Sequence, residues 1–355
     1  MQPARQSSVL IGPLSPLLIA TSFRKLFVPR NKMSKEGLRY NLLLLRRIIS
    51  FVLLVGIVTV VIYHLYHNGA SLIHALSVSP ERLVVLTVLN LAFIFVNGLR
   101  INVLTEVFGI HLRGAEWLGL SATNSLLNYL PAHGGTITRG AYLRQVHNLP
   151  ISAFLASMTA SYLISFVSMG LLGLLAMGVI LISQGIFRWE LTGLLLALVL
   201  GSLFLLSLQK WSGLPFERFP PYLRRVWQGW LIVQNHPRTL FYMAGLDLLG
   251  AFIYACRLFV AFYIVSSPVN FWIVLAITPL SLLSFLVSLT PGGLGIKEAV
   301  IGWTTLLFGG NAVRAVEAAT IDRLLMIICL AIIAGFFSMY FPALLSTKVE
   351  AENGI

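Results

Sequence analysis

The stretch LFYMAGLDLLGAFIYACRLFVAFYIV, which runs from Leu240 to Val265, is a long apolar run that holds two charged residues. About 20 consecutive apolar residues are enough for a helix to cross the hydrocarbon core of a bilayer. Unbroken runs of this kind recur along the chain, for example IISFVLLVGIVTVVIYHLY from Ile48 to Tyr66, and 57% of the 355 residues are hydrophobic. Only 10% are charged, against roughly 25% in ordinary soluble domains. The sequence therefore predicts an all-α polytopic membrane protein.

Apolar segments between charged residues are the candidates for crossing helices. They are 48–66, 83–105, 116–131, 151–183, 191–208, 239–266, 271–289 and 324–346. If all eight crossed, the loop 209–238, with five basic residues and one acid, would lie outside, against the excess of Lys and Arg in cytoplasmic loops. In the alternative that we prefer, six segments cross, and 116–131 and 271–289 form two re-entrant helical hairpins. The prediction is thus six to eight transmembrane segments.

Positive charge is concentrated near the N-terminus. The net charge is +13, and nine of the 25 basic residues lie within residues 1–47. This bias predicts a cytoplasmic segment 1–47, of which 1–32 are expected to be disordered, and an amphipathic cytoplasmic loop at 209–238. With six crossings both termini are cytoplasmic, and the C-terminus lies in a short tail at 347–355. The expected location is the inner (plasma) membrane. Because no basic patch has interleaved aromatic residues, no nucleic-acid partner is expected.

Two features recur in the same order within the predicted membrane domain 48–346. LNLAFIFVNGLR, ending at Arg100, matches LDLLGAFIYACR, ending at Arg257, and YLPAHGGTITR matches LTPGGLGIKE. The copies lie 157 and 160 residues apart. Segments 83–208 and 239–346 are therefore interpreted as two repeats. Six crossings give them opposite orientations, as in the inverted repeats of many transporters.

Glycine and proline close the two proposed re-entrant segments. A helix cannot continue through proline, and glycine allows positive φ and a close approach of backbones. A new helix is predicted from Gly295 to near Phe308, and its N-terminus at membrane depth would offer free amides to an anion such as phosphate. The alternative is a tight interhelical turn with no binding role. The turn residues are Pro131, Gly134, Gly135, Pro291, Gly292, Gly293 and Gly295.

Charged side chains inside apolar runs are the other site candidates. Asp247 and Arg257 each cost roughly 2.5–3.5 kcal/mol at mid-helix, and they lie about 15 Å apart along one helix. Each is therefore expected to face the bundle interior and to find a partner elsewhere. The arginines are predicted to ring a cavity for an anionic head group, with interfacial anchoring of Arg100 and Arg323 as the alternative. The predicted head-group-binding residues are Arg100, Arg139, Arg257, Lys297 and Arg323, and the charge-balancing or proton-carrying residues are Asp247, Glu298 and Asp322.

Motifs for other chemistry are missing from the sequence. Its two cysteines have no metal-ligand spacing, and His64 and His67 are interpreted as an interfacial pair because no carboxylate is nearby. It has no GxxxxGK[ST] phosphate loop, and neither HExxH nor GxSxG occurs. No metal, no cofactor and no ATP-driven step in this chain are therefore expected.

The motif regions resemble a known family. TPGGLGIKEA at Thr290–Ala299 and LPAHGGTITRGAYLRQ at Leu130–Gln145, behind a basic N-terminus, are similar to the flippase-like transmembrane domain of lysylphosphatidylglycerol synthases and of their stand-alone relatives. The resemblance covers roughly residues 40–346. It implies a membrane domain that translocates a lipid between leaflets.

The resemblance also implies roles for individual residues. Arg139, Lys297, Glu298 and the pair Asp322-Arg323 match polar positions of the motif regions. The sequence departs from the family pattern at Ser161-Tyr162, where an acidic-basic pair like Asp322-Arg323 is expected, so a symmetric charge network is in doubt. Only nine residues follow the last predicted span, so no aminoacyltransferase domain is expected and the chain is interpreted as a transporter rather than an enzyme.

The leading hypothesis is a lipid translocase of the inner membrane. Its expected partners are membrane lipids, either an anionic or aminoacylated phospholipid or a polyprenyl-phosphate-linked sugar, and in addition a separate synthase or transferase. The alternative is an enzyme or an accessory membrane subunit in lipid-linked glycan or envelope lipid synthesis. A third hypothesis is a non-catalytic scaffold for such a synthase.

Overall fold

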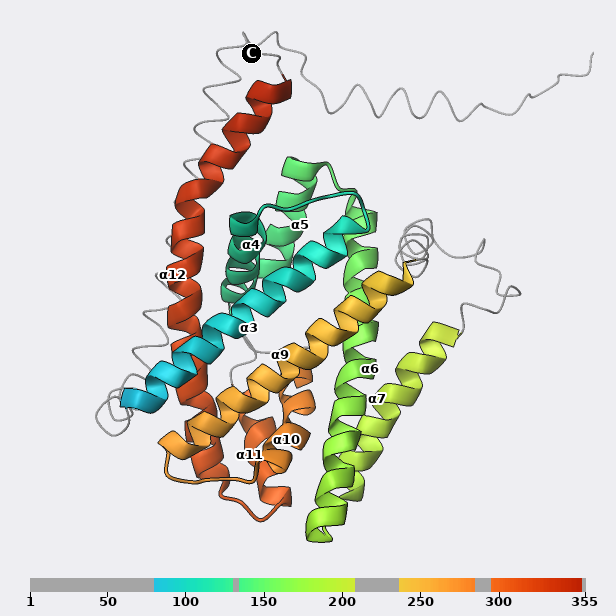
Figure 1. The fold of residues 1–355 in the computed structure, drawn as a ribbon, viewed down its shortest axis with the longest axis vertical. Coiled ribbons are helices and arrows are strands. Elements are labelled where there is room, and N and C mark those ends of the chain that lie inside the picture. The colour runs from blue at the N-terminus through green and yellow to red at the C-terminus, as the bar shows by residue number, and fades with distance from the viewer. Residues whose placement is uncertain (1–79, 130–133, 208–235, 285–294, 353–355) are drawn as a thin grey trace, which may run out of the picture. The chain divides into compact units, whose positions relative to one another are not determined.

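The computed structural model describes residues 80–129, 134–207, 236–284 and 295–352, with the backbone alone for 205–207 and 339–352. Within these ranges the chain forms α-helices and no strand (Figure 1). The helices are α3 (Pro80–Glu106), α4 (Gly114–Leu127), α5 (Gly134–His147), α6 (Ile151–Gln184), α7 (Trp189–Ser207), α9 (Pro237–Ile264), α10 (Phe271–Leu283), α11 (Ile296–Leu307) and α12 (Ala312–Glu352). Several predicted features lie outside the described residues: the segment 1–47 with its disorder, the span 48–66, most of the loop 209–238, and Pro131, Pro291, Gly292 and Gly293.

Four of the described helices are long and apolar enough to cross a membrane. They are Pro80–Glu106, Ile151–Gln184, Pro237–Ile264 and the part of α12 from Ala312 to Ser338. The first three agree with the predicted spans 83–105, 151–183 and 239–266 to within three residues at either end. The chain is thus a multi-pass helical membrane protein.

The predicted start of the last span at 324 is wrong. α12 begins at Ala312, after Asn311, whose Oδ1 accepts hydrogen bonds from the N–H groups of Val313 and Arg314 at 2.9 and 3.2 Å. An asparagine in this position satisfies backbone donors of the first turn and so begins a helix. Asp322 and Arg323 therefore lie about three turns inside α12.

Four of the described helices are too short to cross. α4 and α5 have 14 residues each, α10 has 13 and α11 has 12. At about 1.5 Å per residue these lengths come to roughly 18–21 Å, less than the ~30 Å of the hydrocarbon core. The helix predicted from Gly295 to near Phe308 is confirmed as α11. The entry of the pairs α4–α5 and α10–α11 into the membrane as re-entrant hairpins stays a prediction.

α3 and α9 lie side by side and run in opposite directions (Figure 1). At one end Arg82 Nη1 donates to the carbonyl of Tyr263 at 2.7 Å. In the middle the rings of Phe93 and Tyr254 are 6.1 Å apart. This packing brings charged residues of the first predicted repeat against those of the second.

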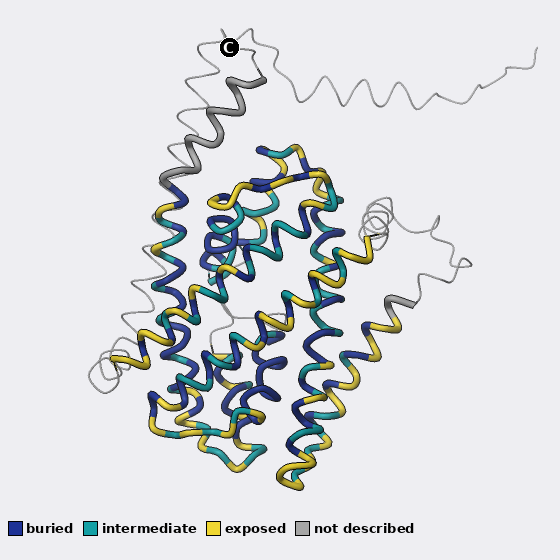
Figure 2. Tube along the Cα trace, viewed as in Figure 1, coloured by how far each residue is buried: buried dark blue, intermediate teal, exposed yellow. Residues whose placement is uncertain are grey.

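The short helices α4 and α10 each pack on a long helix of their own predicted repeat and on one of the other. α4 contacts α3 and α12, and α10 contacts α9 and α6. The long helices also carry apolar side chains on their outer surface, and Figure 2 shows many exposed positions along α7. Exposed large apolar residues there include Leu194, Leu196, Leu200 and Phe204. Such a surface suits contact with lipid chains.

Candidate functional site

A cavity of about 300 Å³ is lined by residues of α3, α4, α5, α6, α9 and α10. Its charged lining residues are Arg100, Arg139 and Asp247. Among the described residues, three amides and six hydroxyls add to this polar lining: Asn97, Asn124, Asn128, Ser121, Ser125, Thr136, Ser161, Tyr162 and Ser165. Three of the four candidate spans contribute to it, so it is a polar space within an apolar bundle.

Arg100 and Asp247 neutralise one another in this cavity. Arg100 Nε lies 2.9 Å from Asp247 Oδ1, and the Asp247 side chain has no exposed surface. Arg100 Nη2 also donates to the hydroxyls of Ser161 and Ser165 at 2.9 and 3.0 Å. Ser165 in turn donates to Asp247 Oδ2 at 2.9 Å. The sequence predicted that Asp247 needs a partner on another element. It has two, Arg100 on α3 and Ser165 on α6.

Arg139 is the cation of the cavity that lacks a carboxylate partner among the described residues. It belongs to α5, is half-buried, and its guanidinium lies over the ring of Phe154 at 5.2 Å. Its Nε is buried and donates no hydrogen bond within the described residues. α5 is held against α4 because Gly135 has no side chain: a Cβ at Gly135 would lie 1.8 Å from the carbonyl oxygen of Asn124.

A second charge cluster joins α9 to α12. Arg257 Nε and Nη2 donate to the two carboxylate oxygens of Asp322 at 2.9 Å each, and both side chains are almost fully buried. The guanidinium also lies over the rings of Phe93 at 4.8 Å and Tyr254 at 5.3 Å. Two parallel hydrogen bonds and two aromatic faces leave Arg257 well occupied in this structure.

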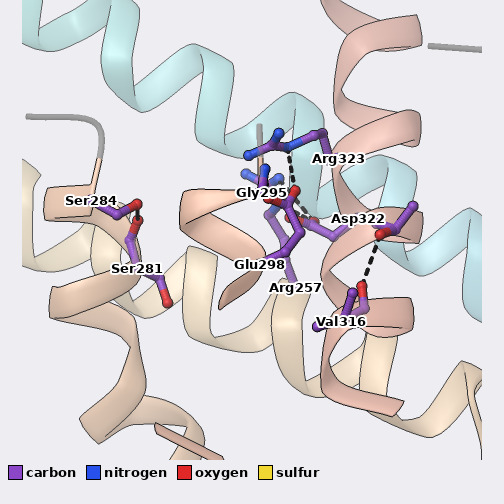
Figure 3. A network of polar contacts seen from close by, with 9 residues as sticks. Arg257, Ser281, Ser284, Gly295, Glu298, Val316, Asp322 and Arg323 are labelled. Atoms are coloured by element: carbon purple, nitrogen blue, oxygen red, sulfur yellow. Dashed lines mark hydrogen bonds and ion pairs between the residues drawn. The ribbon is translucent and has the colours of Figure 1, made fainter. Parts of the chain in front are cut away.

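α11 and its N-cap residue Gly295 extend the same cluster, and Figure 3 shows Gly295 and Glu298 beside Arg323. Arg323 Nε lies 2.9 Å from Glu298 Oε1, and Glu298 Oε2 accepts from the backbone N–H of Gly295 at 2.9 Å. Gly295 precedes α11 with a φ of +81°, a conformation that favours glycine. Lys297 Nζ lies 4.6 Å from the centre of the Tyr254 ring. Glu298 therefore both caps α11 and ties it to α12.

The structure divides the eight predicted charged residues into two groups. Arg100, Arg139 and Asp247 line the cavity, whereas Arg257, Lys297, Glu298, Asp322 and Arg323 form the second cluster and do not line it. Asp247 of the first group and Arg257 of the second lie ten residues apart on α9, or about 15 Å along the helix. Gly134 and Gly135 form the first turn of α5, next to the cavity residue Thr136.

Sequence reasoning missed a third polar group. Glu116, at the start of α4, accepts from the hydroxyl of Tyr142 at 2.6 Å and contacts Nε2 of His147 at the end of α5. Its other oxygen accepts from the backbone N–H of Arg113 at 3.1 Å. A single acid at the start of an apolar segment was the available signal. The cavity amides were also missed, because uncharged residues were not considered as site residues.

Metal binding has no obvious place in the part of the chain that the structure describes. No three His, Cys, Asp or Glu side chains there come together in a way that could hold a metal ion. The arrangement offers instead cations, amides and hydroxyls, which bind anions and hydroxyl groups.

The model of one protein family matches most of the chain. This family, described as the Lysylphosphatidylglycerol synthase TM region, matches residues 47–335. The match includes every residue of the cavity and of the second cluster. Searches of curated proteins and of solved structures gave no match.

Proposed function

Because the chain belongs to the lysylphosphatidylglycerol synthase TM region family, we propose that it is a lipid translocase. The family places it in a membrane lipid-related function. The proposed step is the movement of a phospholipid or another phosphate-bearing lipid between the leaflets of the inner membrane, with both termini of the protein in the cytoplasm. The head group would occupy the cavity while the acyl chains stay in the surrounding lipid.

The proposal rests on Arg139, a cavity cation with no carboxylate partner among the described residues. A cation inside an apolar bundle is costly, and Arg139 has no carboxylate among the described residues to offset that cost, only the Phe154 ring. A phosphate in the adjacent cavity would supply the missing charge through short, charge-assisted hydrogen bonds. Arg100, balanced by Asp247, can orient the same phosphate without adding net charge.

An inverted repeat supports alternating access to this cavity. In the proposed repeat α3, α4, α5 and α6 correspond to α9, α10, α11 and α12. The corresponding helices α3 and α9 run in opposite directions, and the contact of α4 with α12 has its counterpart in the contact of α10 with α6. Rocking of one repeat against the other would expose the cavity to each leaflet in turn. On this proposal α4–α5 and α10–α11 are re-entrant hairpins that enter from opposite sides.

Transport of fluorescent phospholipids in proteoliposomes tests the proposal. The wild-type chain is compared with Arg139→Gln and with Arg144→Gln, an exposed arginine of the same helix that does not line the cavity. We expect head-group-dependent flipping that is lost in Arg139→Gln and kept in Arg144→Gln. A proton gradient across the vesicle then reports on the energy source, with Asp247, Glu298 and Asp322 as the proposed proton carriers.

Absence of flipping by folded wild-type protein, both for every phospholipid and for a short prenyl phosphohexose, would contradict the proposal. That result would favour a role as an enzyme or accessory subunit in lipid-linked glycan synthesis.

A further inference from the structure

Among the residues that the structure describes, the cavity lining has one more cation than it has carboxylates. Arg100 and Arg139 line it, and among the described lining residues Asp247 is the only acid. The two segments outside the description that adjoin α5 and α11, residues 130–133 and 285–294, contain neither Asp nor Glu. The described lining therefore presents one surplus positive charge, which matches a ligand with one more negative than positive charge.

Both oxygens of the Asp247 carboxylate already have partners. Asp247 has no exposed side-chain surface, its Oδ1 lies against Arg100, and its Oδ2 accepts from Ser165. An ammonium group in the cavity would thus meet two arginines and no available carboxylate. Desolvating an ammonium without a counter-charge is strongly unfavourable, so the lining excludes a head group that carries a free amine.

The remaining polar lining is suited to hydroxyl groups. Oδ1 of Asn124 is buried, and no described residue donates a hydrogen bond to it. A buried acceptor without a donor is costly, and a donor from the ligand would satisfy it; because the positive lining disfavours an ammonium, a neutral hydroxyl is the donor that fits. Serine, threonine and amide groups of α4, α5 and α6 surround the same space and both donate and accept hydrogen bonds.

From these observations we infer the substrate class: a lipid whose head group is a single phosphodiester anion joined to a neutral, hydroxyl-bearing group, without an ammonium. The inference rests on the proposed function and specifies the substrate of that same site. A volume of about 300 Å³ is at the small end of ligand pockets, so it holds a head group and not acyl chains. Two lipid sources share this chemistry, a glycerol-bearing phospholipid and a prenyl phosphate-linked sugar.

Binding of short-chain lipids to the purified full-length protein tests the substrate class independently of transport. The probes are dihexanoyl phosphatidylglycerol, phosphatidylmethanol, phosphatidylethanolamine and lysyl-phosphatidylglycerol, which share their acyl chains, and a short prenyl phosphohexose. We expect phosphatidylglycerol or the phosphohexose to bind best, and the tighter of the two identifies the source. The two lipids with an ammonium should bind at least about 10-fold more weakly, the minimum effect of an unpaired buried charge.

Variants at Arg139 and Asn124 assign the preference to residues, with Arg144→Gln as the control. Arg139→Gln should weaken binding of the phosphate-bearing probes by roughly 10- to 100-fold, whereas Arg139→Lys and Arg144→Gln should weaken it less. Asn124→Leu keeps the side-chain size but removes the acceptor. It should abolish the preference for phosphatidylglycerol over phosphatidylmethanol, which carries the same charge and no hydroxyl.

The outcomes separate this inference from the proposed function. Equal or tighter binding of phosphatidylethanolamine or lysyl-phosphatidylglycerol overturns the inference, whatever the transport assay gives. No binding of any probe by folded protein overturns it as well. The expected binding order without any flipping supports the inference and contradicts the translocase.

Discussion

Arg257 on α9 and Asp322 on α12 are joined by two parallel hydrogen bonds, Nε to Oδ1 and Nη2 to Oδ2, both 2.9 Å long. The guanidinium is planar and matches the two oxygens of a carboxylate, which a lysine ammonium cannot do. The pair is almost fully buried. It therefore fixes α9 relative to α12 and leaves no charge for a ligand.

Removal of one member of this pair should destabilise the fold. Arg257→Met leaves Asp322 buried without its partner and is expected to lower the free energy of unfolding by about 3–5 kcal/mol. Arg257→Met with Asp322→Leu leaves no buried charge and should recover most of that loss. Thermal unfolding in detergent measures both variants.

The matched control is an exposed pair on α12. Arg314 and Glu317 are also 2.9 Å apart, but their side chains are 53% and 40% exposed, so Arg314→Met should cost less than about 1 kcal/mol. Equal effects of Arg257→Met and Arg314→Met would show that the buried pair does not hold the helices together.

The sequence predicted the helices of this cluster better than its contacts. The long apolar run around Asp247 and Arg257 predicts α9 almost to its ends, because length and hydropathy are local properties. The partner of Arg257, on the other hand, lies 65 residues away, and no local pattern specifies such a separation. The start of α12 was misplaced for a related reason. Asp322 and Arg323 interrupt the apolar run and were therefore placed at the start of the span. Their ion pairs with residues of α9 and α11 make both acceptable inside it.

The cavity itself could not be predicted from the sequence. It needs six helices in register, and its amides have no pattern that distinguishes them from ordinary polar residues. The motif glycines were a useful signal nonetheless, because Gly135 lies where α5 approaches α4 most closely.

This close approach gives a second prediction. In Gly135→Ala the new Cβ would lie 1.8 Å from the carbonyl oxygen of Asn124, a backbone atom that cannot rotate away. α5 must move from α4, at an expected cost of about 1–3 kcal/mol, and head-group binding should fall because Arg139 moves with α5. Thermal unfolding and lipid binding measure the two effects.

Gly178→Ala on α6 is the control for that substitution. No atom lies within 4 Å of its added Cβ, and alanine favours a helix interior by roughly 0.5–1 kcal/mol over glycine. Gly178→Ala should therefore match or exceed the wild type in stability. A Gly135→Ala protein as stable as Gly178→Ala would mean that the two helices are not held this closely.

Glu116 gives a prediction about pH. Burial raises the pKa of its carboxyl group, but hydrogen bonds from His147, Tyr142 and the Arg113 N–H outweigh burial and lower the pKa below its ordinary 4.5. A lowered pKa in the folded state means that ionised Glu116 stabilises the fold above about pH 4.5 and that this contribution is lost as the pH falls through the lowered pKa. Glu116→Gln should thus lower the melting temperature at neutral pH, and this deficit should shrink as the pH falls below about 4.5. A deficit that does not change with pH would show that the charge of Glu116 is unimportant.

The last prediction concerns where the carboxylate that balances Arg100 is placed. In the proposed repeat Ser161 stands where Asp322 stands in the second copy, and Arg100 Nη2 already donates to its hydroxyl at 2.9 Å. Asp247→Asn should weaken the contact with Arg100 and cost about 1.5–3 kcal/mol, the value of a hydrogen bond to a charged group. Adding Ser161→Asp supplies a carboxylate at hydrogen-bonding distance and restores the net charge of the cavity, so the double variant should regain at least half of the lost stability together with phosphatidylglycerol binding.

Asp247→Asn with Ser121→Asp is the control, because Ser121 also lines the cavity but its hydroxyl donates to the Ile94 carbonyl. If Ser161→Asp restores stability and binding and Ser121→Asp does not, Arg100 requires one adjacent carboxylate, which can come from α9 or from α6. If both second substitutions restore them, or neither does, a specific ion pair of Arg100 is contradicted.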